Sequence, residues 1–161
     1  MSVPVTRVDH SALRTNQAVI ITLNLSAFIL DLPWLAGVVG LLMLLGTLRG
    51  APAFGFIYRR WLKPLHWLAP DVIPDNPQPH RFAQGFGSVV LLIGTIFLFL
   101  GQSLLGWALV WVVVDLAALN LFGGFCVGCA MYYWFYRLDI PGFSQPPPAG
   151  VMPGKRPKVR S

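Results

Sequence analysis

Charged side chains are scarce in this sequence, and their scarcity argues against a soluble globular domain. Of the 161 residues, 11% are charged and 55% are hydrophobic, whereas about 25% of the residues in a typical soluble protein are charged. Residues 1–17 also lack the apolar core and the small-residue cleavage site of a signal peptide. The composition therefore predicts an all-α membrane protein with a polar N-terminal segment at residues 1–17.

Cysteine and histidine are also rare, which limits the metal and haem sites that the chain could build. The two cysteines form one C-x-x-C motif, Cys126 and Cys129, and this supplies only half of a tetrahedral zinc site. Covalent haem attachment would need a histidine at position 130, where the sequence has alanine. No cofactor is identified from the sequence. The three histidines, which have no ligand spacing among them, are His10, His66 and His80.

Apolar runs that approach the length of a membrane span occur in four places. A transmembrane helix needs about 17–25 apolar residues. Asp31 and Pro33 separate the first two runs, and proline inside one long helix would remove a backbone donor and clash with the preceding turn. We therefore predict four transmembrane helices in two hairpins, at residues 18–49 and 81–122. The runs cover roughly residues 18–32, 34–48, 85–101 and 104–122.

All twelve basic residues fall on one side of this four-span arrangement. The net charge is +6, but the distribution of the charge indicates membrane orientation and gives no reason to expect a nucleic-acid partner. By the positive-inside rule, both termini and the central loop are predicted to be cytoplasmic. The basic residues are Arg7, Arg14, Arg49, Arg59, Arg60, Lys63, Arg81, Arg137, Lys155, Arg156, Lys158 and Arg160.

The chain contains an internal repeat. Arg14 and Gln17 form an R-x-x-Q motif before the first apolar run, and Arg81 and Gln84 form another 67 residues later. Each motif leads into two predicted spans and then into an aromatic, basic segment. The sequence therefore predicts two tandem hairpins related by an axis near the membrane normal.

The segments outside the hairpins are rich in aromatic residues, basic residues or proline. Residues 50–80 combine an amphipathic, interfacial helical segment with a linker from Ala69 to His80 that is predicted to be extended. Residues 123–140 carry the C-x-G-C motif and an aromatic helix, which is expected to form an interfacial belt. Residues 141–161 form a proline-rich basic tail that is expected to be disordered unless a partner binds it.

The two cysteines are the first candidates for chemistry. Gly123 and Gly124 are expected to interrupt the fourth helix and leave Cys126 near the N-terminus of a following helix, where a thiolate is stabilised. On the predicted cytoplasmic side a permanent structural disulfide is not expected. Three interpretations stay open: small apolar residues at a helix end, thiol redox or sulfur carriage, and half of a metal site.

The two R-x-x-Q motifs are the second candidates. An arginine in the first turn of a helix opposes the helix dipole, so Arg14 and Arg81 need another explanation. They either anchor the helices to lipid headgroups, with Gln17 and Gln84 bonding nearby backbone, or converge near the cysteines to bind an anion.

Asp115 is the third candidate because it lies near the middle of the fourth predicted span. A carboxylate inside a membrane is costly and is treated as a functional candidate. It lies eleven residues before Cys126 and would share a helical face with it if the helix were continuous. The favoured alternative is a hydrogen bond across the bundle, with the candidate partners Thr22, Asn24, Thr95 and Asn120.

Together, three motifs resemble the bacterial domain-of-unknown-function family numbered 4395. They are the Arg14–Gln17 pair, the P-x-R-F-A-Q pattern at residues 79–84, and Phe-Cys-Val-Gly-Cys at residues 125–129. The resemblance covers residues 8–137. It implies a small multipass protein of the bacterial inner membrane without an assigned activity, associated with sulfur metabolism and thioredoxin-like proteins.

Three functions remain in view from the sequence. The first is a thiol-dependent redox or sulfur-carrier protein acting at the cytoplasmic face, with a thioredoxin-like or sulfur-transfer partner. The second is a structural accessory subunit of a respiratory or photosynthetic complex, and the third is a transporter that works as a homo-oligomer. All three imply contact with membrane lipids.

Overall fold

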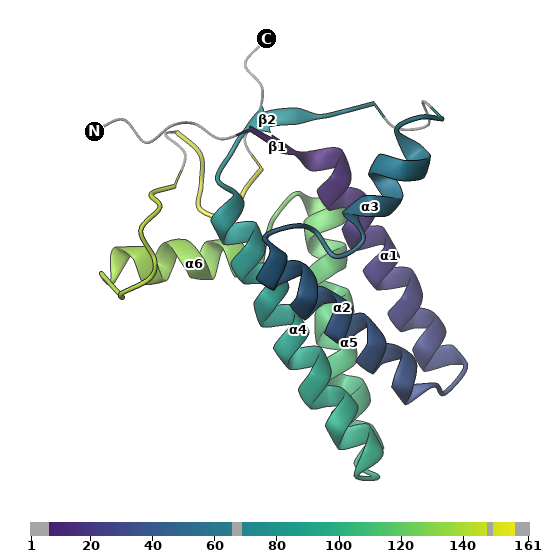
Figure 1. Ribbon diagram of the computed structural model, residues 1–161. Coiled ribbons are helices and arrows are strands. Elements are labelled where there is room, and N and C mark those ends of the chain that lie inside the picture. The colour runs from purple at the N-terminus through teal and green to yellow at the C-terminus, as the bar shows by residue number, and fades with distance from the viewer. Residues whose placement is uncertain (1–6, 66–68, 148–149, 157–161) are drawn as a thin grey trace.

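The computed structural model describes residues 7–65, 69–147 and 150–156, and most of them are helical. Four long helices form the body of the molecule, and two short strands and three shorter helical segments complete it (Figure 1). In chain order the elements are β1 (Arg7–Asp9), α1 (His10–Ile29), α2 (Pro33–Arg49), α3 (Gly55–Ile57), a π-helical turn (Tyr58–Leu62), β2 (Val72–Pro74), α4 (Pro77–Phe99), α5 (Ser103–Gly123) and α6 (Val127–Arg137).

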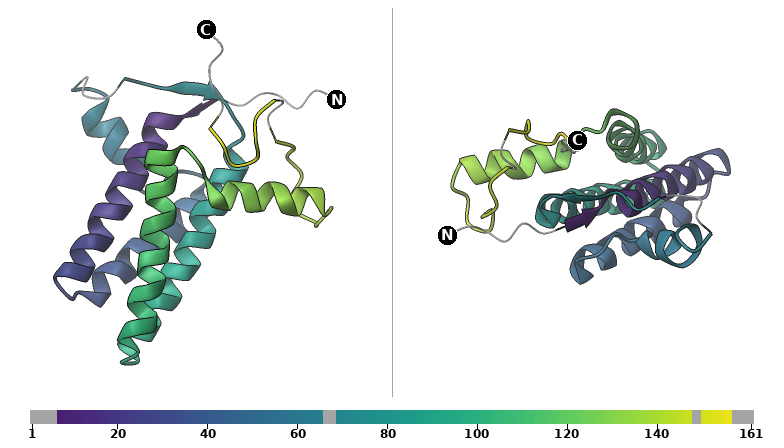
Figure 2. Two further views of the ribbon diagram at one scale, coloured as in Figure 1. Left: turned by 180° about the vertical axis from the view of Figure 1, so that it is seen from behind. Right: turned by 90° about the horizontal axis from the view of Figure 1, so that it is seen from above.

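The long helices α1, α2, α4 and α5 run alternately down and up, and their chain order gives two helical hairpins (Figures 1 and 2). α4 packs against both α2 and α5, and α1 closes the bundle against α5 and α2. Small and branched apolar side chains fill the centre of the bundle. The buried core consists of Ile20, Ala27, Ala36, Val39, Met43, Phe54, Leu91, Leu98, Val110, Val113 and Ala117.

The outer faces of these helices are apolar, and two of the helices are long and apolar enough to cross a membrane. These are α4 and α5, whereas α2 is a shorter apolar helix of 17 residues. Large hydrophobic side chains such as Leu104, Phe122 and Ile29 are exposed. The prediction of a mostly helical protein is confirmed, and two of its helices are candidate membrane spans. Four spans and a structural repeat stay predictions.

The turns between the helices follow from local chemistry. Pro33 occupies the first turn of α2, where its missing N–H has no intrahelical partner to lose. Gly124 ends α5 in a left-handed conformation, with φ of 61°, which glycine adopts without strain. This break allows the chain to turn sharply before α6, which packs against α4 and projects sideways from the bundle (Figures 1 and 2).

The two strands join the beginnings of both hairpins. β1 pairs with β2 in antiparallel register, with Val8 opposite Ile73, and β1 leads directly into α1 while β2 leads into α4. The sequence-based prediction of an extended linker up to His80 is therefore wrong at its end. Pro77 to His80 form the first turn of α4, because Pro77 is compatible with a helix N-terminus.

The described part of the tail packs on the cysteine motif, contrary to the prediction of disorder without a partner. Cys126 N–H donates to the Gly154 carbonyl at 2.7 Å, and Arg156 N–H donates to the Gly124 carbonyl at 3.0 Å. Arg156 also forms an ion pair with Asp71. These bonds satisfy backbone groups that the break after α5 leaves free.

α6 packs closely on α4 because both helices have small residues at the contact. A Cβ atom at Gly128 would lie 2.5 Å from the Cβ and 2.7 Å from the Cα of Ala83. Tyr132 is buried here and donates a hydrogen bond to Gln78 at 2.8 Å. The predicted aromatic belt is thus only partly correct, because Tyr132 and Tyr133 are buried while Trp134 is exposed.

The amphipathic segment of the first half is helical from Gly55 to Leu62. Its basic residues Arg59 and Arg60 are exposed, and so is Trp61, whereas Tyr58 is fully buried. The remainder of the predicted segment includes His66, which lies outside the described residues together with positions 67 and 68.

Candidate functional site

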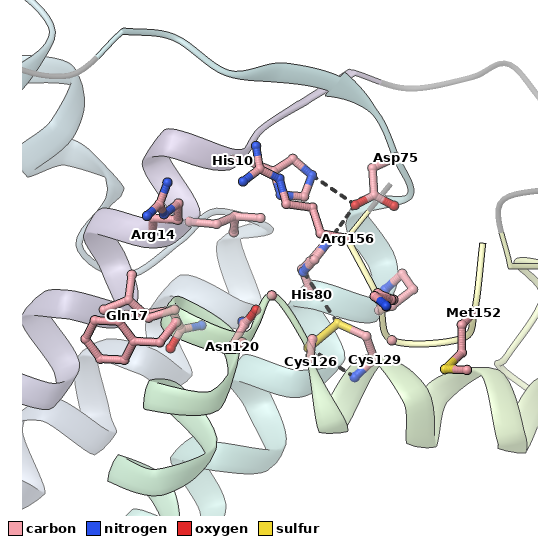
Figure 3. Close-up of a pocket in the computed structure, with 18 of the residues that line it drawn as sticks. His10, Arg14, Gln17, Asp75, His80, Asn120, Cys126, Cys129, Met152 and Arg156 are labelled. Atoms are coloured by element: carbon pink, nitrogen blue, oxygen red, sulfur yellow. Dashed lines mark hydrogen bonds and ion pairs between the residues drawn. A yellow bond between two sulfur atoms is a disulfide. The ribbon is translucent and has the colours of Figure 1, made fainter. Parts of the chain in front are cut away.

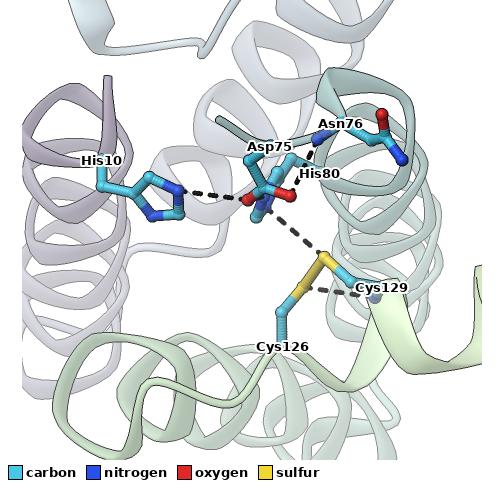
Figure 4. Close-up of a disulfide and its surroundings, with 6 residues drawn as sticks. All are labelled: His10, Asp75, Asn76, His80, Cys126 and Cys129. Carbon is cyan, nitrogen blue, oxygen red and sulfur yellow. Dashed lines mark hydrogen bonds and ion pairs between the residues drawn. A yellow bond between two sulfur atoms is a disulfide. The ribbon is translucent and has the colours of Figure 1, made fainter. Parts of the chain in front are cut away.

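The C-x-G-C motif forms the centre of the candidate site. Cys126 and Cys129 are joined by a disulfide, with their Cα atoms 5.2 Å apart. Cys126 is the N-cap residue of α6, and its Sγ accepts a hydrogen bond from the Cys129 N–H at 3.2 Å (Figure 4). A sulfur at this position receives the positive end of the helix dipole and a backbone donor, and both stabilise a thiolate.

A buried carboxylate links the two histidines that lie above the disulfide (Figure 4). Asp75 Oδ2 is 3.1 Å from His10 Nε2 and 2.9 Å from His80 Nε2. A carboxylate accepts hydrogen bonds, so each Nε2 carries the proton that it donates to Asp75. In neutral His80 the other ring nitrogen, Nδ1, is then left with a free lone pair.

This free nitrogen points to the cysteine pair. His80 Nδ1 lies 3.4 Å from Cys129 Sγ. Cys129 is 3% exposed and Cys126 is 6% exposed, so water does not solvate either sulfur freely. When the disulfide is reduced, the Cys129 thiol has His80 Nδ1 as its acceptor, which is the geometry required for proton transfer between them.

The hydrogen bonds that join Asp75 to His10 and His80 also determine the pKa of Asp75. Burial acts to raise the pKa of Asp75, but hydrogen bonds from His10 and His80 outweigh it and hold that pKa well below its ordinary value. Asp75 therefore stays ionised at neutral pH and fixes the orientation of both imidazole rings. Nearby, burial and the charge of Asp75 raise the pKa of Tyr133 to about 12, so this phenol stays protonated.

A pocket of about 250 Å³ opens onto the disulfide and the two histidines (Figure 3). α1, the start of α4, the end of α5, α6 and the tail all contribute to its walls. Three of its lining residues, Arg14, Lys155 and Arg156, are cationic. Positive charge around a cysteine pair lowers thiol pKa and attracts anionic groups.

The structure separates the two R-x-x-Q motifs that the sequence presents as equivalent. Arg14 and Gln17 line the same pocket as the cysteines, on the side across from them, as Figure 3 shows. Arg81 instead donates to the carbonyls of Thr47 and Leu48 at the end of α2, at 2.6 and 3.3 Å. The predicted convergence of both arginines on the cysteines is therefore wrong, because Arg81 caps a helix C-terminus.

Gln84 is also a structural residue. Its Nε2 donates to the Met43 carbonyl at 3.0 Å and lies 3.3 Å from the Ala51 carbonyl. Its Oε1 accepts from Ala53 N–H at 3.2 Å and from Asn16 at 3.4 Å. One amide thereby connects α4 to α1, to α2 and to the loop that follows α2.

Asp115 and Asn24 do not form the predicted hydrogen bond across the bundle. Asp115 lies on the exposed face of α5, and Asn24 is fully buried and donates to the Ile20 carbonyl of its own helix at 2.8 Å. Within the described ranges, Asn24 Oδ1 has no partner. α5 ends at Gly123, so the helix is not continuous from Asp115 to Cys126.

Sequence reasoning missed the residues that complete the site, namely His10, Asp75 and His80. It sought ligand spacing along the chain, and these positions show none. They meet because the pairing of β1 with β2 brings residue 10 next to residues 75 and 80. The one sequence feature that pointed to His80 as a site residue was its position directly before Arg81 of the second R-x-x-Q motif.

Fold and site together define a helical protein with two candidate membrane-spanning helices and a histidine-flanked disulfide at one end. The family model described as "Domain of unknown function (DUF4395)" matches residues 8–137, and the chain belongs to this family. The resemblance noted from the sequence is thereby confirmed. Neither the curated proteins nor the solved structures gave a match.

Proposed function

We propose that this protein is a four-span integral membrane protein of the bacterial inner membrane that carries out thiol–disulfide exchange at its cytoplasmic face. The observation that carries the proposal is the contact between His80 Nδ1 and Cys129 Sγ at 3.4 Å. A cysteine pair that only filled space would need no buried base oriented by a carboxylate. Here a base, a helix N-terminus and cationic residues all act on the same two sulfur atoms.

The cytoplasmic orientation is supported by where the basic residues lie. α1 and α4 begin, and α2 and α5 end, at the end of the bundle that also holds α6 and the strands (Figure 1). The basic residues Arg14, Arg49, Arg81 and Arg137 belong to this end. The turns at the opposite end, residues 30–32 and 100–102, contain no basic residue. By the positive-inside rule the cysteine end then faces the cytoplasm.

The proposed reaction exchanges the disulfide with a dithiol protein of the thioredoxin class. A partner thiolate attacks Cys126 Sγ, a mixed disulfide forms, and the bond to Cys129 breaks. As it attacks, the partner thiol gives its proton to His80 Nδ1, and Cys129 leaves as a thiolate and takes that proton from His80 Nδ1. The partner's second thiolate then attacks its own sulfur and releases Cys126, so that the partner is oxidised by two electrons and the cysteine pair is reduced.

Each residue near the pair has a distinct role in this proposal. The α6 N-terminus and the Cys129 N–H stabilise the Cys126 thiolate, which makes it the better leaving group and nucleophile. His80 exchanges a proton with Cys129, and Asp75 keeps the His80 ring in the required tautomer. Arg14 adds positive charge at the pocket wall, and the segment from Met152 to Arg156 must move to admit a macromolecular partner.

The exchange can be tested on the protein reconstituted in lipid nanodiscs. Purified protein is equilibrated with mixtures of reduced and oxidised dithiothreitol, and the thiol state is read by gel shift after maleimide alkylation. The rate of reduction is then measured across pH for the wild type and for His80→Gln, with Asp115→Asn as a control on the exposed face of α5. We expect a reversible two-electron transition, and an exchange rate that falls at least tenfold in His80→Gln alone.

Two results would contradict the proposal. One is a disulfide that excess dithiothreitol does not reduce in the folded protein, and the other is an exchange rate that His80→Gln leaves unchanged. Orientation is tested separately in intact spheroplasts. Reduced Cys126 should react with a membrane-permeant maleimide and be protected from an impermeant one.

A further inference from the structure

We propose that the reduced site binds a zinc ion through Cys126 Sγ, Cys129 Sγ and His80 Nδ1. The inference rests on the proposed function in one respect, because it requires the cysteine pair to exist as a dithiol. It concerns an equilibrium binding property of that state, and this can be measured without any exchange partner.

The three proposed ligand atoms lie close together, and one of their separations already matches a zinc site. All of them lie within 4.8 Å of one another. In a tetrahedral zinc site with Zn–S of about 2.3 Å and Zn–N of about 2.0–2.1 Å, nitrogen and sulfur ligands are about 3.6 Å apart and two sulfurs are about 3.8 Å apart. The His80 to Cys129 distance of 3.4 Å is close to the first value. Reduction breaks the disulfide bond, and the two sulfurs can then move apart to the distance of about 3.8 Å that a zinc site requires.

The histidine is oriented as a metal ligand would be. A ligating histidine usually donates its other ring N–H to a carboxylate, which fixes the tautomer and increases the basicity of the ligand nitrogen. His80 Nε2 meets Asp75 Oδ2 at 2.9 Å, and Asp75 is buried. His10 holds the same carboxylate oxygen at 3.1 Å. The lone pair of His80 Nδ1 is thus directed towards the sulfurs by two further residues.

Charge and space are compatible with zinc at this position. Arg14, Lys155 and Arg156 line the pocket and would repel a bare cation. However, two thiolates and one neutral imidazole bring the charge of the bound complex to zero, and the same cations favour the thiolate form that binds. The pocket provides room for water as the fourth ligand, so the site would have three protein ligands and one exchangeable position.

The neighbouring group of His10, Asp75 and His80 also has ligand atoms within 4.8 Å of one another. It is the weaker candidate because its atoms are already used in hydrogen bonds, with both Nε2 atoms donating to Asp75 Oδ2. Thiolate sulfur also binds zinc more strongly than an oxygen ligand does. The sulfur-containing set is therefore the one proposed, and zinc binding and the disulfide exclude each other.

The test uses the full-length protein in nanodiscs, reduced and freed of metal under anaerobic conditions. Zinc alone is titrated against a chromophoric chelator, and cobalt(II) is added in a parallel sample as a spectroscopic probe. We expect one zinc per reduced chain, thiolate-to-cobalt charge-transfer absorption with tetrahedral visible bands, and no binding to the disulfide form. Asp75→Asn should weaken zinc binding about 10–100-fold, and His80→Gln should weaken it at least as much.

His10→Gln is the matched control, because His10 contacts the same carboxylate but lies outside the proposed ligand set. It should retain stoichiometric binding and the cobalt–thiolate absorption. Binding by the alternative set would be weakened in His10→Gln and would give no cobalt–thiolate absorption in any variant, because that set has no thiolate. Wild-type protein that binds no zinc, or binds it without cobalt–thiolate absorption, overturns the proposal even if every variant misfolds. Zinc affinity that is equal in the wild type and folded His80→Gln also overturns it.

The two proposals can fail independently. If the protein exchanges its disulfide with dithiothreitol but binds no zinc when reduced, the proposed function stands and the proposed metal site is refuted. If the chemically reduced protein binds zinc but the disulfide of the folded protein resists dithiothreitol, the proposed metal site stands and the proposed exchange function is refuted.

Discussion

The two R-x-x-Q motifs share a sequence pattern and a position at the beginning of a hairpin, yet they make different contacts. Arg14 and Gln17 line the pocket that also contains the cysteines. Arg81 and Gln84 bond to the end of α2 and to the loop behind it. The second motif therefore holds the two hairpins together, and the first is free to face the site.

The difference arises because α4 packs more extensively against neighbouring helices than α1 does. α4 packs against α2, α5 and α6, whereas α1 packs mainly against α5 and α2. A motif at the start of α4 is surrounded by other elements and forms structural bonds. The same motif at the start of α1 meets an open pocket, so a sequence repeat does not imply a repeated role.

The largest expected effect comes from breaking the joint between the two hairpins at Asp75. Its pKa is lowered in the folded state, so its stabilising contribution is present above the ordinary carboxyl pKa of about 4 and is lost as pH falls below that value. Asp75→Asn should cost about 2–3 kcal/mol of unfolding free energy at pH 7. Unfolding measured by circular dichroism from pH 3 to 7 should show a smaller pH dependence in the variant.

The second prediction concerns the close contact of α6 with α4. Gly128→Ala places a methyl group against the backbone of Ala83 and should lower the free energy of unfolding by about 1–3 kcal/mol. Gly87→Ala on α4 is the matched control, since its Cβ would meet only the flexible end of Met43 at 3.2 Å. Equal melting temperatures for the two variants would refute the close α4–α6 contact.

The third prediction compares the two glutamines directly. Gln84→Ala removes an acceptor for the Ala53 N–H and should cost about 1–2 kcal/mol. For Gln17→Ala we expect less than about 0.5 kcal/mol, as for most substitutions without such bonds. Chemical unfolding of both variants in the same detergent measures this difference in unfolding free energy. A larger loss of stability in Gln17→Ala than in Gln84→Ala would contradict the structural role assigned to Gln84.

The smallest expected effect comes from the two arginines. Arg81→Ala should cost about 0.5–1 kcal/mol, because the exposed guanidinium caps the α2 C-terminus, and it should leave cysteine reactivity unchanged. Arg14→Ala should leave the unfolding free energy unchanged but slow maleimide alkylation of the reduced pair a few-fold at pH 7. A loss of cysteine reactivity in Arg81→Ala but not in Arg14→Ala would contradict the separate roles assigned to the two arginines.

The sequence predicted the helical class and the family, and its apolar runs overlap the four long helices, because apolar runs, prolines and glycines act locally. It placed Cys126 near a helix N-terminus for the same reason, since Gly123 and Gly124 mark a break. It could not place His80 against Cys129, because that contact joins residues 49 positions apart. The separate roles of Arg14 and Arg81 depend on tertiary neighbours, which a repeat in the sequence conceals.

The contact of the tail with Cys126 has an evolutionary consequence. The family match ends at residue 137, so both sulfurs, His10, Asp75 and His80 belong to the shared region. Gly154, whose carbonyl binds the Cys126 N–H, does not. In the proposed function, the groups that react and the segment that covers them thus lie in separate parts of the chain. A family member with another sequence after this point would keep the proposed reactive groups under a different cover.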